Sequence, residues 1–146
     1  MTLPELFKDL RSGKFKPVYL LHGEEPYFID QVTNWMEANT LSDAEKGFNQ
    51  TILYGKDTDM ATVMNAAKRY PMMSTYQLII VKEAQDLKWA KEEANEFVLN
   101  YFEKPLSSTI LVLAFKYANF DKRKKIYKLI DKSGLIFQSE PVRDYK

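Results

Sequence analysis

The sequence predicts an α/β fold of three layers, in which helices cover both faces of a five-stranded, mainly parallel sheet. Short apolar runs of strand length alternate along the chain with longer segments that have helical periodicity. The run at residues 109–115, TILVLAF, is typical of a parallel strand that is buried on both faces. With 146 residues and 45% hydrophobic composition, the chain can bury one core, so we expect a single domain over residues 1–146.

Charge and cysteine content exclude several classes of function. The 21 Lys and Arg residues nearly balance the 20 Asp and Glu residues, so the net charge of +1 gives no bulk attraction to nucleic acid or membrane. The absence of cysteine excludes disulfides and thiolate metal sites. The N-terminus lacks the pattern of a signal peptide, and no apolar run approaches the ~18 residues of a membrane span. We therefore expect a soluble, cytoplasmic protein without a membrane partner.

The chain begins with a short helix, a buried strand and a longer helix. Residues 3–10 carry apolar side chains at helical spacing, with Thr2 at a cap position and Gly13 at the end. Residues 17–21, PVYLL, form an apolar run that is too short for a buried helix and therefore indicates a strand. Residues 27–38 have one apolar and one polar side, which predicts the first crossover helix.

A second strand and helix follow. Residues 40–47 form a polar connection with room for a helical turn, and the alternation in residues 48–54 predicts the second strand. Thr58 or Asp59 caps a helix that runs through Arg69, because the proline two positions later forbids continuation.

The second half of the chain contains the remaining three strands. Residues 77–81 predict the third strand, and a polar segment then leads into a helix over residues 93–102. The fourth strand, the TILVLAF run, should be central. Asp121 is expected to cap a basic helix over residues 122–132, and residues 135–138 predict the fifth strand. Periodicity does not determine the order of the strands, but ligand sites of such sheets lie at the carboxyl ends of the strands.

The loop after the first strand is the place to look for a phosphate site. A P-loop nucleotidase has the pattern GxxxxGK followed by Ser or Thr there, because glycine N–H groups and the lysine must reach phosphates. This chain instead has His22, Gly23, Glu24 and Glu25, with one glycine, two carboxylates and no lysine. We interpret the loop as a tight turn in which both glutamates favour the positive N-terminus of the following helix, without bound phosphate.

The rest of the sequence offers no catalytic or metal-binding constellation. His22 is the single histidine, and neither GxSxG nor HExxH spacing occurs. Lys82 stands where a nucleotidase would have a magnesium-binding Asp-Glu pair, and Glu92 with Glu93 has the pattern of a solvated surface. We therefore expect no catalytic residue, no metal and no cofactor.

Two linked segments carry a resemblance to a known family. Residues 16–31 read KPVYLLHGEEPYFIDQ, and residues 70–87 read YPMMSTYQLIIVKEAQDL. Together they resemble the N-terminal domain of the delta subunit of the bacterial DNA polymerase III clamp loader. Members share a strand ending in Gly-x-Glu and, further on, an apolar pair, a short polar link and a valine-rich strand. The resemblance covers essentially the whole chain.

This resemblance implies an AAA+-type fold with the sheet order 5-1-4-3-2 and a degenerate nucleotide site that does not hydrolyse ATP. The missing lysine of the first loop agrees with that. The implied role is DNA replication, as an accessory subunit of DNA-directed DNA polymerase III, a nucleotidyltransferase complex. No intrinsic activity is expected of the subunit itself.

The resemblance also implies a binding site for the sliding clamp, the beta subunit. In the family, the apolar pair before the third strand inserts into a hydrophobic pocket of the clamp ring, and the subunit opens one clamp interface. The matching residues here are Met72 and Met73, with Pro71 and Tyr70 beside them. Many members have aromatic or leucine side chains at the pair, but methionine adapts to irregular pockets. The alternative is that both methionines face the protein's own core.

Further partners follow from the same resemblance. Family members carry a lid domain and a collar domain that assembles the loader, so we expect this chain to be an N-terminal fragment that binds the clamp without assembling the loader. The loader encloses primed DNA, and the basic run Lys122, Arg123, Lys124 and Lys125 either faces that DNA or is a solvated helix face. The rival functions are a P-loop-like nucleotide hydrolase and another α/β protein-interaction module.

Overall fold

The computed structural model describes residues 1–141; residues 142–146 of the predicted domain lie outside it. The strands of its five-stranded sheet are β1 (Val18–Gly23), β2 (Gln50–Tyr54), β3 (Gln77–Lys82), β4 (Thr109–Lys116) and β5 (Leu135–Ser139). The helices are α1 (Leu3–Arg11), α2 (Pro26–Asn39), α3 (Asp43–Asn49), α4 (Met60–Ala67), α5 (Trp89–Glu92), α6 (Glu96–Glu103) and α7 (Lys125–Ser133), with 3-10 turns η1 (Gly55–Asp57) and η2 (Ala84–Asp86).

The strand order is β2-β3-β4-β1-β5, and every neighbouring pair is parallel. This confirms the α/β class and the order that the resemblance implies. β4 is central, as predicted from its uninterrupted apolar sequence, and pairs with both β1 and β3. Within residues 1–141, no helix combines the length and apolar character that crossing a bilayer requires.

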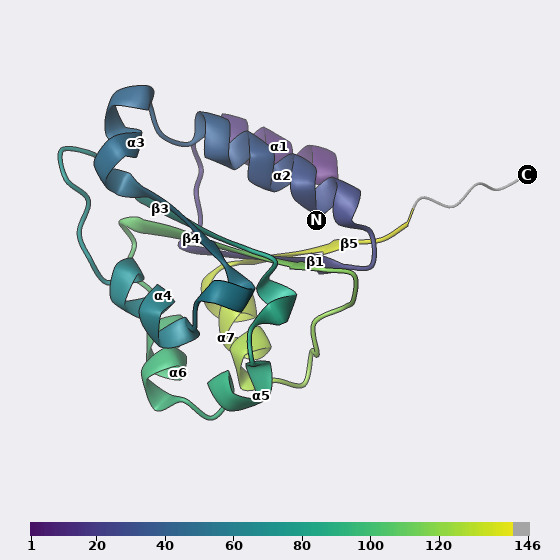
Figure 1. Ribbon diagram of the computed structural model, residues 1–146. Coiled ribbons are helices and arrows are strands. Elements are labelled where there is room, and N and C mark those ends of the chain that lie inside the picture. The colour runs from purple at the N-terminus through teal and green to yellow at the C-terminus, as the bar shows by residue number, and fades with distance from the viewer. Residues whose placement is uncertain (142–146) are drawn as a thin grey trace, which may run out of the picture.

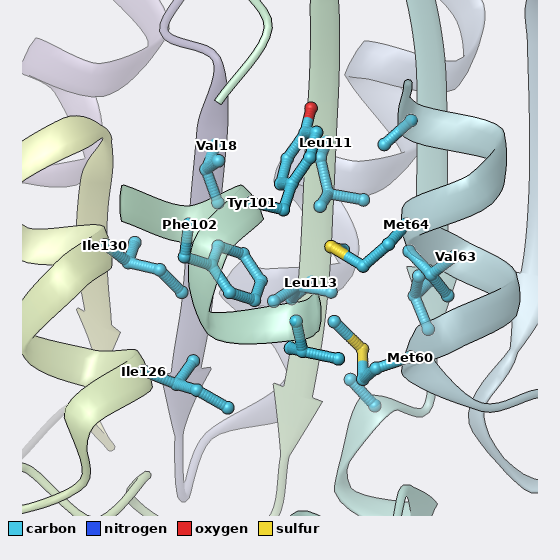
Figure 2. Close-up of a cluster of buried hydrophobic side chains, with 14 of the residues drawn as sticks. Val18, Met60, Val63, Met64, Tyr101, Phe102, Leu111, Leu113, Ile126 and Ile130 are labelled. Atoms are coloured by element: carbon cyan, nitrogen blue, oxygen red, sulfur yellow. The ribbon is translucent and has the colours of Figure 1, made fainter. Parts of the chain in front are cut away.

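Helices form a layer on each face of the sheet. α1 and α2 cover one face, and α4, α6 and α7 cover the other (Figure 1). Successive residues of β1 point to opposite faces, so Val18 and Leu20 belong to one core while Tyr19 and Leu21 belong to the other. Figure 2 shows the core in which side chains of α4, α6 and α7 meet over β1 and β4.

The connection expected before the second strand is a helix, α3. A capping box begins it, because the Glu45 carboxylate accepts hydrogen bonds from the backbone N–H and the hydroxyl of Ser42, both at 2.9 Å. α3 extends through Phe48 and Asn49, so β2 begins at Gln50 and the predicted strand boundary at residue 48 is wrong. Asn49 therefore ends a helix, and its side chain contacts Met72 in the loop that precedes β3.

Glu92 and Glu93 are not the solvated surface pair that the sequence suggests. Glu92 is buried, and its Oε2 accepts a hydrogen bond from the backbone N–H of Met60 at 2.6 Å. The Glu93 carboxylate accepts from the backbone N–H groups of Lys125 at 2.5 Å and Ile126 at 3.1 Å. Each glutamate therefore satisfies N–H groups that have no partner within their own helix, at the starts of α4 and α7.

Three further helix boundaries differ from the predictions. α4 ends at Ala67 rather than Arg69, and the helix expected over residues 93–102 is divided into α5 and α6. α7 begins at Lys125, because Glu93 rather than Asp121 binds its first N–H groups. The side chain of Asp121 instead accepts from the backbone N–H of Arg123 at 2.9 Å, which forms a turn before the helix.

Candidate functional site

Residues 68–76 connect α4 to β3, and we call this segment the methionine loop. Its apolar side chains face solvent: Tyr70 is 75% exposed, Met72 is 61% exposed and Met73 is 100% exposed. The alternative that the two methionines belong to the core is therefore wrong. Exposed apolar residues at one place on a surface mark a candidate interaction site.

The backbone of the methionine loop holds Met73 in an unusual conformation. Its φ angle is +54°, in the left-handed region. This region costs a residue with a Cβ atom roughly 1–2 kcal/mol, because the Cβ approaches the following carbonyl oxygen. The strain coincides with complete exposure of the side chain, so packing of Met73 itself does not offset it. Other contacts of the loop must hold this conformation.

Asn49 provides the contact in the middle of the loop. Its Oδ1 accepts from the backbone N–H of Met72 at 2.7 Å, and its Nδ2 donates to the carbonyl oxygen of Met72 at 2.9 Å. Nδ2 also lies 2.9 Å from the carbonyl oxygen of Glu45, one turn earlier in α3. Asn49 is 3% exposed. A buried amide on a helix thus binds both backbone polar groups of the residue before Met73.

Three more contacts hold the ends of the loop. Just before its start, at the end of α4, Gln77 donates through Nε2 to the carbonyl oxygen of Ala66 at 3.1 Å, and the Thr109 hydroxyl donates to that of Ala67 at 2.6 Å. At its end, the ring of Tyr76 meets the ring of Phe15 edge to face, with centroids 5.6 Å apart. The loop is therefore anchored to α3, β3, β4 and the segment before β1 while its methionines point outward.

Phe48 adds a further exposed aromatic side chain at this edge of the sheet. It is 80% exposed and directly precedes Asn49. Gln50 pairs with Leu78 in the parallel ladder, so the start of β2 and the start of β3 lie at the same edge. The sequence interpretation missed Phe48 and Asn49 by assigning both to a strand. The Ser42 to Glu45 capping box was the signal that predicts a helix there.

The loop after β1 lies at the opposite edge of the sheet, where the strands end. Glu25 is the N-cap of α2, and its carboxylate accepts from the backbone N–H of Tyr27 at 3.0 Å. Pro26 is the first helical residue and has no N–H to offer. The Glu25 carboxylate thus takes the position at a helix N-terminus that a phosphate would need, which confirms the prediction for Glu25 but not for Glu24, which is exposed.

Gly23 in this loop serves packing. Its φ angle is +142°, and a Cβ atom at this position would lie 1.9 Å from the carbonyl oxygen of Ser139. Ser139 also donates through its hydroxyl to the carbonyl oxygen of Glu25 at 2.7 Å. The loop is therefore pressed against the end of β5. Exposed Glu24 stands beside these contacts.

His22 is a structural residue of β1. Its ring is buried, and Nδ1 accepts from the backbone N–H of Phe120 at 2.9 Å. Burial, and secondarily the positive charge of Lys122, lowers the pKa of His22 to about 4. The imidazole is therefore neutral near pH 7; its Nδ1 is bound by the Phe120 N–H, while its buried Nε2 has no hydrogen-bond partner among residues 1–141.

Charged groups at the ends of β3 and β4 pair with one another. Lys116 is 9% exposed, and its Nζ lies 2.7 Å from a Glu83 oxygen and 3.1 Å from an Asp30 oxygen. Burial raises the pKa of Glu83 and lowers that of Lys116, but their hydrogen bonds outweigh it, so the pKa of Glu83 is lowered overall and that of Lys116 raised. Lys82 pairs with Glu37 at 2.8 Å. The ammonium group of Lys116 thus lies between two carboxylates.

The decisive comparison is with protein families. The model of the family described as DNA polymerase III, delta subunit, matches residues 19–140, which is most of the chain. The chain belongs to the DNA polymerase III delta subunit family. The match spans the loop after β1, the methionine loop and all five strands except the first residue of β1.

Individual proteins similar to this delta-family chain agree with the family match. DNA polymerase III subunit delta of Bacillus subtilis (strain 168) is 27% identical over 141 residues, covering 93% of this chain and 41% of the relative. The solved Bacillus subtilis DNA clamp loader delta protein (YqeN) superimposes with a TM-score of 0.80 at 22% identity, over 97% of this chain and 43% of that one. A DNA polymerase III gamma subunit-related protein from Thermotoga maritima has a TM-score of 0.56 at 14% identity, over 99% and 47%. The chain thus spans less than half the length of these relatives.

The basic residues of this delta-family chain form a turn and not the helix face that was predicted. Lys122, Arg123 and Lys124 precede the first residue of α7, and Lys125 begins it. The Arg123 guanidinium lies 3.1 Å from Asp121, and this hydrogen-bonded pair lowers the pKa of Asp121 to about 2. One of the four cations is therefore neutralised locally.

Proposed function

We propose that this domain binds the sliding clamp through the methionine loop and contributes to opening the clamp ring during DNA replication. Met72 and Met73, flanked by Tyr70 and Pro71, insert into an apolar pocket of the clamp. The single observation that carries the proposal is Met73: it is fully exposed, in a left-handed conformation, on a loop that its neighbours hold in place. Family membership supports the clamp as the occupant.

Burial of the two methionines contributes enough free energy for an interface hot spot. Burial of one methionine contributes about 1.5–3 kcal/mol, so two methionines contribute several kcal/mol to a complex. The anchoring of the loop adds to this, because a loop already held in its bound conformation loses less entropy on binding. Phe48 lies at the same edge of the sheet, and we include it in the proposed contact surface.

We further propose that the domain does not hydrolyse ATP. The support is chemical: the loop after β1 contains no lysine, its helix start is capped by Glu25, and Pro26 removes one N–H donor. The carboxylates of Asp30 and Glu83 are paired with the ammonium group of Lys116. The domain therefore acts as a cytoplasmic accessory subunit that works by binding.

Contacts with the other loader subunits are proposed to involve the regions of the relatives that this chain does not match. DNA is a partner of the whole complex. For the turn at Lys122, Arg123, Lys124 and Lys125, we propose at most a backbone contact with DNA, since Arg123 already pairs with Asp121.

Co-elution with the sliding clamp of the same organism tests the proposal. The wild-type chain is expected to elute with the clamp on gel filtration, and the Met72→Ala, Met73→Ala double variant is expected to elute alone. If the wild type and the double variant elute with the clamp in equal yield, the methionine loop is not the binding site. An ATPase assay on the same samples tests the second part, with no phosphate release expected.

A further inference from the structure

The contact between Asn49 and Met72 joins two segments that lie far apart in the sequence. Asn49 is the last residue of α3, and its side chain uses both of its polar atoms on the backbone of Met72, at 2.7 and 2.9 Å. The amide is buried, whereas the Met72 side chain is largely exposed. The bond therefore fixes the backbone of the loop without covering its apolar side chains.

The position of this contact relates it to the display of Met73. Met73 directly follows Met72 and has the positive φ angle, a conformation that a chain leaves when nothing holds it. The hydrogen bonds from Gln77 and Thr109 are made to the end of α4. The ring of Tyr76, which packs against Phe15, lies three residues after Met73. Asn49 thus holds the residue before the strained one from another helix, while the Ser74 hydroxyl, on the other side of Met73, donates within the loop to the carbonyl oxygen of Tyr76 at 2.8 Å.

We propose that Asn49 is a positioning residue for clamp binding, which preorganises the methionine loop so that Met73 points outward before the partner arrives. The inference rests on the proposed function and adds a residue that does not touch the clamp. Loss of the Asn49 side chain allows the loop to sample other conformations. The clamp then binds only the molecules whose loop is in the competent conformation. The apparent affinity for the clamp therefore falls in proportion to the fraction of such molecules.

The chain contains a matched control for this residue. Asn39 is the last residue of α2 and donates through Nδ2 to the carbonyl oxygen of Trp35 at 3.0 Å, four residues earlier. Asn49 makes the same bond to Glu45 within α3. The two asparagines therefore share their helical position and their local bond, but Asn49 is buried and contacts Met72, whereas Asn39 is exposed. Asn39→Ala thus controls for loss of the local bond at a helix end, and Asn49→Asp, which stays at the buried position, tests the contact with Met72.

Two measurements on the full chain test the inference. Amide hydrogen exchange of the free protein is expected to accelerate about tenfold or more at Met72 in Asn49→Ala, with the amides of β3 unchanged. Titration with the sliding clamp is expected to show an affinity about tenfold lower. Asn39→Ala is expected to match the wild type in both. Asn49→Asp keeps the acceptor for the Met72 N–H, so its exchange rate and clamp affinity are expected to lie between those of Asn49→Ala and the wild type. This variant serves as the test if Asn49→Ala fails to fold.

The outcomes separate the inference from the proposed function. If Asn49→Ala equals Asn39→Ala in exchange at Met72, or loses protection while its clamp affinity stays at the wild-type value, the positioning role is wrong and the methionine site stands. If the Met72→Ala, Met73→Ala variant binds the clamp like the wild type, the proposed function fails and the positioning role fails with it. General loss of protection across β2 and β3 in Asn49→Ala, with no rescue by Asn49→Asp, identifies a purely structural residue and overturns the inference.

Discussion

The buried carboxylate of Glu92 accepts a hydrogen bond from the backbone N–H of Met60 at 2.6 Å, which joins α5 to the first turn of α4. Glu92→Ala leaves this N–H without its acceptor and is expected to lower the free energy of unfolding by about 1–3 kcal/mol. Glu92→Gln keeps an acceptor oxygen and should lose less. Urea unfolding of both variants checks the order. Equal stability of the alanine variant and the wild type would show that the bond contributes nothing.

Gly23 and Gly47 provide a paired test of backbone strain. A Cβ atom at Gly23 would meet the Ser139 carbonyl oxygen at 1.9 Å, and the φ angle of +142° disfavours any side chain. Gly23→Ala is therefore expected to lower the free energy of unfolding by about 2–5 kcal/mol. Gly47 lies inside α3 with nothing within 4 Å of its Cβ position. Gly47→Ala is expected to raise stability by about 0.5–1 kcal/mol. Chemical denaturation measures both, and a stable Gly23→Ala protein would contradict the close approach.

The stability of the domain should fall in mild acid because of His22. Its folded pKa of about 4 is below the ordinary value of 6.5, so the unfolded chain binds the proton first as pH decreases. The contribution of the neutral His22 ring to the free energy of unfolding is complete above pH 6.5. It is lost as the pH falls to about 4, which lowers the free energy of unfolding by up to about 3 kcal/mol. His22 is the single histidine, so His22→Asn should flatten this part of the profile. Thermal melts between these pH values check the slope, and an unchanged slope in the variant would contradict the assignment.

Phe48 tests the extent of the proposed clamp surface. Its side chain is 80% exposed, so Phe48→Ala is expected to leave the free energy of unfolding within about 0.5 kcal/mol of the wild type. If Phe48 contacts the clamp, the same change lowers affinity by about 1–2 kcal/mol, or roughly tenfold. Clamp titration and thermal unfolding of this variant decide the point. Wild-type affinity would limit the surface to the methionine loop.

The sequence predicted the sheet well because its strands are short apolar runs with clear boundaries. The TILVLAF run of β4 is the best example, since burial on both faces leaves a pattern that needs no partner to be recognised. The exposure of Met72 and Met73 was predicted by the resemblance to the family, whereas the residue pattern alone left open that both face the core.

The start of α7 and the anchoring of the methionine loop were missed for one physical reason, which is competition from contacts distant in sequence. Asp121 has the local pattern of a helix cap, but Glu93, 32 residues before Lys125, binds the first N–H groups of α7. Asn49 binds Met72 across 23 residues, and no periodicity reveals such a pair. These two features therefore required the structure, whereas α3 had a local signal in the Ser42 to Glu45 capping box.

The central claim is that Met72 and Met73 bind the sliding clamp and do not stabilise the fold. Its most direct test is calorimetric titration of the clamp with the wild type, with Met72→Ala, Met73→Ala, and with Tyr54→Ala. Tyr54 is the control, because it is 46% exposed at the carboxyl end of β2, the opposite edge of the sheet. We expect the methionine variant to bind about 100-fold or more weaker. Its thermal midpoint should equal that of the wild type, and Tyr54→Ala should bind normally. Unchanged clamp affinity in the methionine variant, or a fall in its thermal midpoint large enough to explain the loss of binding, would contradict the account.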